Sequence, residues 1–345
     1  MINSLKKQQL GLSLIELMIA AAIGIFLTAG LIQLFTSSQQ TYRIQDNQSR
    51  LQENLRFAFD FISHDIRMAD HAGCKSNPVE DITNHLNALS AEYDMGLHNF
   101  ATGGVIGMNG PTGEAGAADA PDNISILKAI DSGVVITAPM GNSASDINIS
   151  TGGNLELGDL ILIADCESAD IFQVSNTVPV GNIIVHDTTN VEAADGFPGN
   201  TNTSLCTAVA PAQCLSTAYT DNAQILQLVR VTYDIAAGQN GQLALFRTFE
   251  GNRTELIEGI ENMQILYGED TNHDNTVDYY VPAGTPGLDM RQVVSIKISL
   301  LATSIEDNLV TQPLTYTMFK IPITSTDLRL RRVFTTTIAL RNRLL

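Results

Sequence analysis

Residues 11–35 read GLSLIELMIAAAIGIFLTAGLIQLF, and this stretch decides how the rest of the chain is arranged. It is apolar almost throughout and long enough to cross a bilayer as one helix, which needs about 20 residues. Its one formal charge is Glu16. A carboxylate at the centre of a membrane costs about 2.5–3.5 kcal/mol on insertion scales, so we expect Glu16 to have a partner.

Two general interpretations explain this stretch incompletely. A secretory signal peptide has a shorter apolar core, of about 7–15 residues, followed by a cleavage site of small residues. Here the apolar run continues past Ala20, Ala21 and Ala22 without a break. A plain membrane anchor fits the length, and Lys6 and Lys7 would then stay cytoplasmic, but it leaves Glu16 unexplained.

A third interpretation rests on the order of a basic leader, Gly11, the residues LSLI, Glu16 and a long apolar helix. This order resembles the N-terminus of type IV pilins. The resemblance implies that a prepilin peptidase cuts after Gly11 and methylates the new amine of Leu12, where the family usually has Phe. It also implies that Glu16 acts in assembly by pairing with an N-terminal amine, which offsets the cost of burying either charge alone.

The helix is predicted to continue well beyond the apolar stretch. Apolar residues recur at helical spacing and are Ile44, Leu51, Leu55, Phe59, Ile62, Ile66 and Ala69. No proline occurs from residue 12 to residue 77. We therefore predict one helix over residues 12–70, with residues 12–35 in the membrane, a head packed on the remainder, and Gly73 as the stop.

Both ends of the chain resemble the PilW family of type IV minor pilins. Residues 51–74, LQENLRFAFDFISHDIRMADHAGC, are similar to the segment that follows the helix in that family. Residues 256–268, 293–301 and 331–343 are similar to its C-terminal part and, more distantly, to the J-type pseudopilins of type II secretion. The middle, about residues 75–222, resembles the family weakly.

The remaining sequence predicts strands separated by loops. Short β-type runs occupy residues 124–127, 134–137, 159–163, 171–174 and 182–185, with irregular chain before and after them. Residues 225–235, 242–249, 263–267, 293–301 and 315–321 alternate, and we expect them to form one sheet over the helix. The predicted fold is α+β and type IV pilin-like, with a long N-terminal helix on an antiparallel β-sheet head. Its parts are a leader (1–11), the helix (12–70), a loop-rich β region (71–222) and a C-terminal β-sheet region (223–345).

Composition limits the compartment and the partners. The net charge is −18, which argues against a body held on nucleic acid by phosphate contacts. Four cysteines fit an oxidising compartment such as the periplasm. Cys206 and Cys214 are close enough for a local disulfide, which leaves Cys74 with Cys166, although four cysteines allow three connectivities.

One segment has the pattern of a metal site. Asp270, Asn272, Asp274 and Asp278 place oxygen side chains at alternate positions, as at the start of a calcium-binding loop. Asn275 stands where such a loop has Gly, and the usual bidentate glutamate is replaced by Val281. Calcium is therefore a candidate structural ligand, and an acidic β-turn is the alternative.

Other charged residues suggest no chemistry. The six histidines are scattered, and neither a metal-protease motif nor a nucleophile elbow occurs, so we expect no enzyme. A cluster of C-terminal arginines is either surface charge or a docking patch for an acidic subunit; it comprises Arg329, Arg331, Arg332, Arg341 and Arg343.

The resemblance implies a minor pilin that primes or caps a type IV pilus. Its partners would be other minor and major pilins, prepilin peptidase, the inner-membrane assembly platform and, before assembly, the membrane itself. The head would face the periplasm first and the cell surface afterwards. The alternatives are a type II secretion pseudopilin and a membrane-presented adhesive or ligand-binding protein.

Overall fold

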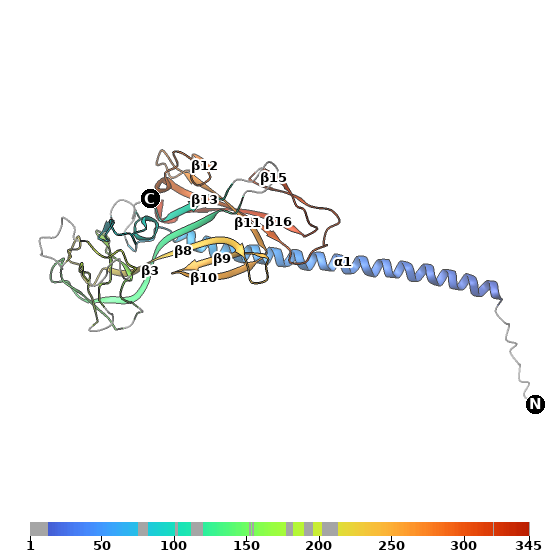
Figure 1. Cartoon of the computed structure of the whole chain (residues 1–345), viewed down its shortest axis with the longest axis horizontal. Coiled ribbons are helices and arrows are strands. Elements are labelled where there is room, and N and C mark those ends of the chain that lie inside the picture. The colour runs from blue at the N-terminus through green and yellow to red at the C-terminus, as the bar shows by residue number, and fades with distance from the viewer. Residues whose placement is uncertain are drawn as a thin grey trace, which may run out of the picture.

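A long helix that carries a β-rich head dominates the molecule (Figure 1). The computed structural model describes residues 13–74, 82–100, 103–111, 120–151, 153, 155–176, 182–189, 196–201, 213–319 and 321–344. Helix α1 spans Leu14–Arg67, and its N-terminal half projects away from the head. The α+β, pilin-like fold predicted from the sequence is confirmed.

Strands make up most of the head. In chain order the elements after α1 are β1 (Ile82–Asn84), α3 (Met95–His98), β2 (Val105–Met108), β3 (Asn123–Ala138), β4 (Ile147–Ile149), β5 (Leu160–Ala164), β6 (Ala169–Gln173), β7 (Ile183–Ile184), β8 (Gln224–Ala237), β9 (Leu243–Phe249), β10 (Asn252–Glu258), β11 (Ile260–Glu269), β12 (Tyr279–Val281), η3 (Met290–Gln292), β13 (Val293–Thr303), β14 (Thr315–Met318), β15 (Ile321–Thr324), β16 (Arg331–Ala339) and η4 (Arg341–Arg343).

Two long antiparallel strands, β3 and β8, run the length of the head. The first part of β3 pairs with the last part of β8, and the same two strands pair again near Val135 and Gln224. At one end they pair with β2 and β9, and at the other with β4 and β5. Their side chains therefore enter three different cores: Ile124 packs with the helix, and Leu127 and Val134 pack in two separate cores in the distal part of the head.

The C-terminal strands form a second sheet. Its order is β12-β11-β13-β16, and all its neighbouring strands are antiparallel. The expectation of one sheet is thus wrong, because β8 and β9 belong to the ten-stranded sheet and β14–β15 form a separate hairpin. Alternation along a strand identifies its buried face, but pairing partners are set by contacts between distant residues.

Both sheets contribute to the core beneath α1. Its apolar stripe buries Leu51, Leu55, Ile62 and Ile66 against residues of both sheets. Along β13, inward side chains such as Ile298 belong to the same core. Tertiary packing of an amphipathic face stabilises most protein helices, and here it acts only on the C-terminal half of α1.

Helix α1 ends just before two residues with left-handed backbone conformations. The α-helical residues stop at Arg67, with Met68 as the C-cap, close to the predicted end. Asp70 and Gly73 then adopt positive φ values of 59° and 71°. Gly73 accommodates that conformation without strain, so the chain leaves α1 toward the distal part of the head.

Candidate functional site

The first turn of α1 is closed by its own side chains. The backbone N–H of Glu16 donates to Ser13 Oγ (3.2 Å), and the backbone N–H of Ser13 donates to Glu16 Oε2 (2.9 Å). This reciprocal pair is a capping box, which the S-x-x-E pattern favours. It turns the carboxylate of Glu16 back toward the start of the helix.

The predicted cleavage and methylation site lies outside the described residues. Both Gly11 and Leu12 fall there, so processing stays a prediction. The described geometry nonetheless bears on Glu16, because the Ser13 amide that it binds belongs to the residue directly after Leu12. A charge at the backbone nitrogen of Leu12 would therefore lie one residue from the amide that already binds this carboxylate.

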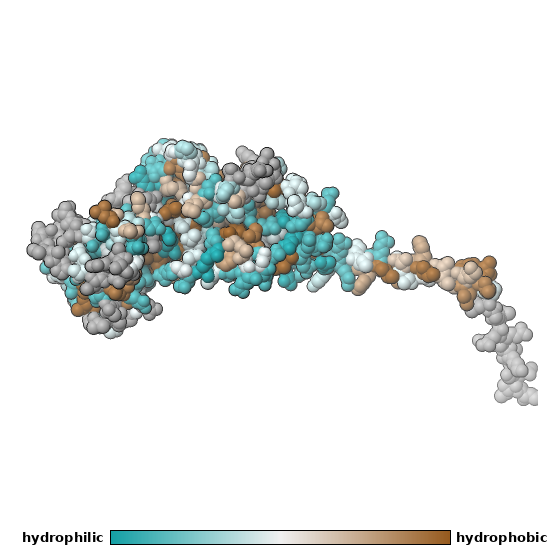
Figure 2. Space-filling model, in the orientation of Figure 1, coloured by the Kyte–Doolittle hydropathy of each residue, from teal (hydrophilic) through white to brown (hydrophobic). Residues whose placement is uncertain are grey.

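The N-terminal half of α1 has no apolar surroundings within the described chain. Every residue from Ser13 to Arg43 is at least partly exposed, and Phe26 keeps 80% of its surface. Figure 2 shows this part of the helix as an apolar projection beyond a largely hydrophilic head. Helix α1 is long and apolar enough to cross a membrane. So large an apolar surface requires lipid or other protein segments around it.

Two threonine hydroxyls in this half are satisfied within the helix itself. The Thr28 hydroxyl donates to the Gly24 carbonyl (2.7 Å), and the Thr36 hydroxyl donates to the Ile32 carbonyl (3.0 Å). Hydrocarbon offers no alternative partner for such groups. Their local bonds make this half compatible with an apolar medium.

The C-terminal end of α1 is fastened to the end of the chain. Asp70 is fully buried, and Arg343 Nε donates to its Oδ2 (2.5 Å). Arg343 also donates to the carbonyls of Met290 and Val293, and Asn342 donates to the Ala69 carbonyl (2.8 Å). The residues that these bonds join lie far apart in sequence, so no local pattern indicated the bonds.

A second arginine connects β16 to β11 across the intervening strand β13. Arg331 is 8% exposed and donates to both carboxylate oxygens of Glu261 (2.7 and 2.8 Å). It also pairs with Asp327, and this hydrogen bond lowers the pKa of Asp327 to about 2. Arg329 bonds Gln242. Three of the five arginines that suggested a docking patch are therefore occupied within this chain.

The comparison with protein families concerns the same C-terminal part. Residues 219–342 match the PilW family, described as type IV pilus-assembly protein W. No curated protein and no solved structure gives a significant match.

The PilW match confirms the resemblance seen in the sequence over its C-terminal part and indicates a type IV pilus-related protein. It begins just before β8 and ends at Asn342, and so includes the second sheet. These strands cover the C-terminal half of α1 and contain the groups that fasten its end, Asn342 among them. The matched part therefore contains much of the head that holds the helix, while Val105, Ile124 and Lys128 hold it from outside the match.

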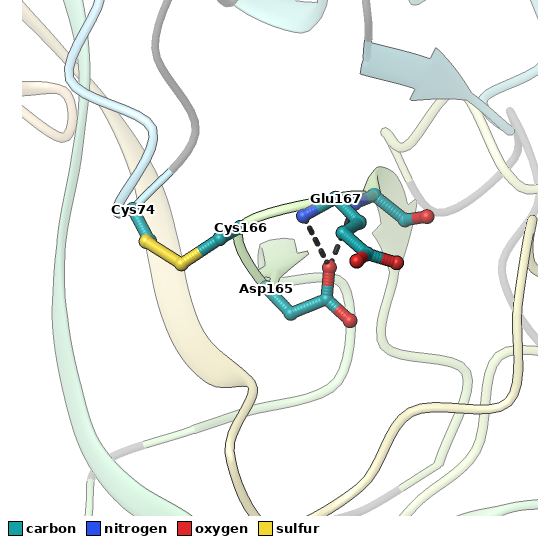
Figure 3. The surroundings of a disulfide bond; sticks show 5 residues. Cys74, Asp165, Cys166 and Glu167 are labelled. Carbon is teal, nitrogen blue, oxygen red and sulfur yellow. Dashed lines mark hydrogen bonds between the residues drawn. A yellow bond between two sulfur atoms is a disulfide. The ribbon is translucent and has the colours of Figure 1, made fainter.

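A disulfide connects the end of α1 to the distal part of the head. Cys74 and Cys166 are bonded, with a Cα–Cα distance of 5.0 Å (Figure 3). Cys166 lies in the turn between β5 and β6, where Asp165 accepts hydrogen bonds from the Glu167 and Ser168 amides. This is the pairing that the sequence left by elimination. Cys214 is also disulfide-bonded, but its predicted partner Cys206 lies outside the described residues.

The candidate calcium loop is closed by its own backbone. Asp270 accepts from the Asp274 and Asn275 amides, Asp274 accepts from the Thr276 amide, and Asp278 accepts from the Thr271 amide. Asn275 has a φ of 67°, the left-handed conformation that Gly would take in a calcium loop. Within the described ranges, no group of three or more His, Cys, Asp or Glu side chains is arranged to hold a metal ion. Calcium stays a prediction from the sequence.

One buried polar cluster was not predicted. His85 Nε2 lies 2.6 Å from Asp170 Oδ1, and both side chains are fully buried. Ser216 and Tyr219 donate their hydroxyl groups to the same carboxylate, at 2.6 and 2.5 Å. Burial next to this carboxylate raises the pKa of Tyr219. The serine bonds the carboxylate and not the imidazole, so the cluster joins three segments and is not arranged as a nucleophile with its base.

Proposed function

We propose that this protein is a minor pilin, a low-copy structural subunit that primes or caps assembly of a type IV pilus. The observation that carries the proposal is the combination of a PilW match with an apolar half-helix that has no partner in the described chain. A pilin needs such a half-helix twice, first in the inner membrane and then among the helices of a filament.

The proposed maturation uses the start of α1. Prepilin peptidase would cut after Gly11 and methylate Leu12, and Glu16 would then pair with an N-terminal amine of its own chain or a neighbour. The capping box supports this role, because Glu16 already binds the backbone of Ser13. In a filament core, the pairing would offset the cost of burying each charge. The head would lie in the periplasm before assembly and on the pilus afterwards, with other pilins and the assembly platform as partners.

The test is the N-terminus of the protein made with and without prepilin peptidase. Intact mass and N-terminal sequencing should give a chain that begins at methylated Leu12 only when the peptidase is present. A chain that keeps Met1, or is cut elsewhere, contradicts the proposal. Glu16→Gln should then be processed normally but enter pili poorly, while Glu53→Gln, the same change at an exposed position in the C-terminal half of α1, is the control.

The peptidase would also process a type II secretion pseudopilin. These two functions are separated by the phenotype of a deletion strain. Loss of surface pili with normal protein secretion supports the minor pilin, and normal pili with a secretion defect supports the pseudopilin.

A second candidate, an adhesive or ligand-binding head, is favoured by one observation. The region between β3 and β8 has its own apolar core and lies at the end of the molecule away from the free half-helix (Figure 1). Deleting all of residues 75–222 would not test it, because Val105 and Ile124 also pack beneath α1. Replacing residues 139–222 with a short Gly/Ser linker, together with Cys74→Ser, keeps β3 and β8. Loss of adhesion with pili retained would support a binding role.

A further inference from the structure

Strand β16 presents an open edge, in the sense that no strand is hydrogen-bonded to it on that side; the hairpin strand β14 packs near it without pairing. It pairs with β13 over nine residues, Arg331–Ala339, without a register shift, and it is the last strand of its sheet. In the described chain, its backbone makes no hydrogen bond outside this pairing. Proteins usually protect such edges with charged side chains, proline or a bulge. Residues 331–339, RRVFTTTIA, contain no proline and no bulge, and their only charges are the two arginines at the start of the strand.

A groove runs between this strand and the flank of α1. Its volume is about 460 Å³, and Leu55, Phe59 and Phe334 give it an apolar floor. The rings of Phe59 and Phe334 lie 5.5 Å apart, yet Phe334 keeps 51% of its surface exposed. A strand added to β16 would lie about 4.8 Å from it, so its inward side chains would cover Phe334.

The surface along this groove is basic, although the molecule as a whole is acidic. Arg56 and Arg332 line the groove from α1 and from β16. Arg67 and Arg341 follow at the far end, where Asn342 bonds the backbone of Arg67. All four guanidinium groups are exposed and have no ion-pair or hydrogen-bond partner in the described ranges. Asp60 is the one carboxylate among the lining residues, whereas the whole chain carries a net charge of −18.

We propose that the free edge of β16 is a docking site for an extended acidic segment of a neighbouring subunit, which adds to the sheet as a further strand. Backbone hydrogen bonds would supply binding, and alternate side chains would supply specificity. The carboxylates of the segment would meet Arg56, Arg332 and Arg341, and an apolar side chain would cover Phe334. Charge complementarity of this kind sets register and speeds association.

The open edge distinguishes this occupant from a neighbouring helix. A helix lying in the groove would use Phe59 and Phe334 but would leave the backbone groups of β16 unpaired. The proposal depends on the pilin function only for the identity of the neighbour. The measurement below uses this chain alone, so its failure would overturn the docking site and leave the N-terminal processing test unaffected.

The test titrates the full chain, purified in detergent micelles, with three labelled nine-residue peptides. The first alternates Glu and Val, the second alternates Lys and Val, and the third is the Glu–Val peptide with every backbone nitrogen methylated. We expect the Glu–Val peptide to bind and to slow amide hydrogen exchange in residues 331–339. The Lys–Val peptide should bind at least tenfold more weakly. The methylated peptide should not bind, because it has no N–H groups to donate to β16 and its methyl groups obstruct strand pairing.

Variants locate the site. Arg332→Glu should weaken binding of the Glu–Val peptide by about tenfold or more, and Phe334→Ala should also weaken it. Arg50→Glu is the matched control, since Arg50 lies on another flank of α1 and pairs with Asp46. The docking site is wrong if the Glu–Val peptide does not bind at about 1 mM; a Kd of that size corresponds to a binding free energy of about −4 kcal/mol. It is also wrong if all three peptides bind alike, or if exchange slows elsewhere and not in β16. Retained binding of the methylated peptide would favour a helix-type or purely ionic contact instead.

Discussion

At the scale of single residues, buried charges hold the head on the helix. Asp65 is 3% exposed and lies in the last turns of α1. Its carboxylate accepts hydrogen bonds from Lys128 of β3 (2.7 Å), Tyr233 of β8 (2.5 Å) and Arg247 of β9 (3.0 Å). One carboxylate thus contacts three strands. Removing one member of such a buried group leaves the others uncompensated.

We therefore expect Asp65→Asn to lower the free energy of unfolding by about 3–5 kcal/mol, the usual cost of breaking a buried ion pair. The chain has no tryptophan, so urea unfolding of the full chain in detergent should be followed by circular dichroism or tyrosine fluorescence. The control is Asp46→Asn, which removes an exposed pair with Arg50 and should change stability by less than about 1 kcal/mol. Equal effects of the two variants would contradict the assigned role of Asp65.

Asp327 should make stability depend on pH in acid. Its pKa in the folded state, about 2, lies below the value of about 3.9 for an unfolded chain. A lowered pKa stabilises the fold fully above the unfolded value, and the contribution is lost as the pH falls from about 4 to about 2. The carboxylate is one-third exposed, so we expect about 1 kcal/mol.

The measurement compares the wild type with Asp327→Asn from pH 7 to pH 2. The difference in unfolding free energy should be largest above pH 4 and should approach zero near pH 2. Contributions of the other carboxylates cancel in this difference. A difference that is constant with pH would show that Asp327 acts through packing and not through charge.

At the scale of elements, the two halves of α1 are stabilised in different ways. Its C-terminal half is stabilised by a continuous core, while its N-terminal half has only backbone hydrogen bonds and a capped first turn. The same kind of side chain therefore has different energetic roles in the two halves. Ile62 is fully buried, and Ile25 keeps 72% of its surface.

This contrast gives a matched pair of substitutions. Ile62→Ala should lower the free energy of unfolding of the head by about 2–5 kcal/mol, the usual range for such a truncation in a core. Ile25→Ala removes the same atoms from the free half and should leave head stability unchanged. Urea unfolding of both variants in detergent measures the difference. A large loss from Ile25→Ala would mean that the free half contacts the head.

The loop of residues 270–278 provides a test of metal binding. Because its carboxylates already accept hydrogen bonds from the loop backbone, we expect the melting temperature to be the same in calcium and in a chelator. Asp274→Ala should then change it equally in both conditions. A melting temperature that rises with calcium in the wild type alone would show that the loop rearranges around the ion.

Periodicity predicted the elements better than their arrangement. The helix and most of the main strands are visible in the sequence because their patterns are local. The division into two sheets is not, since β8 and β11 look alike as alternating runs. Arg343 was likewise interpreted as surface charge or as part of a docking patch, because nothing near it in sequence indicates Asp70, a partner that lies 273 residues away. The start of the predicted site, Gly11 and Leu12, was assigned by resemblance alone.

At the scale of the whole molecule, β3 and β8 connect the core under α1 to two distal cores. The core under α1 takes most of its residues from the segment that matches PilW. The distal cores are formed mainly by residues outside that segment. The disulfide between Cys74 and Cys166 adds a covalent connection between the end of α1 and the distal part. The two parts are thus joined by continuous strands and by a crosslink.

Cys74→Ser with Cys166→Ser should destabilise the distal part more than the core under α1. The crosslink joins residues separated by 92 positions, and a loop of that size is worth up to about 4–5 kcal/mol in the chain-entropy model. Amide hydrogen exchange should therefore rise more in β5 and β6 than in β13. A uniform rise across both parts would show that the head unfolds as one unit.

The crosslink also determines how the molecule responds to tension. If α1 is held in a filament and the distal end of the head is pulled, part of the load passes from α1 directly through the sulfur–sulfur bond to the turn between β5 and β6. That path bypasses residues 75–165 of the chain and the pairing of β3 with β8. Strand hydrogen bonds break one after another when a sheet is pulled open, whereas a covalent bond does not. In the oxidised state, the turn between β5 and β6 should thus stay next to the end of α1 at forces that would pull the two apart after reduction.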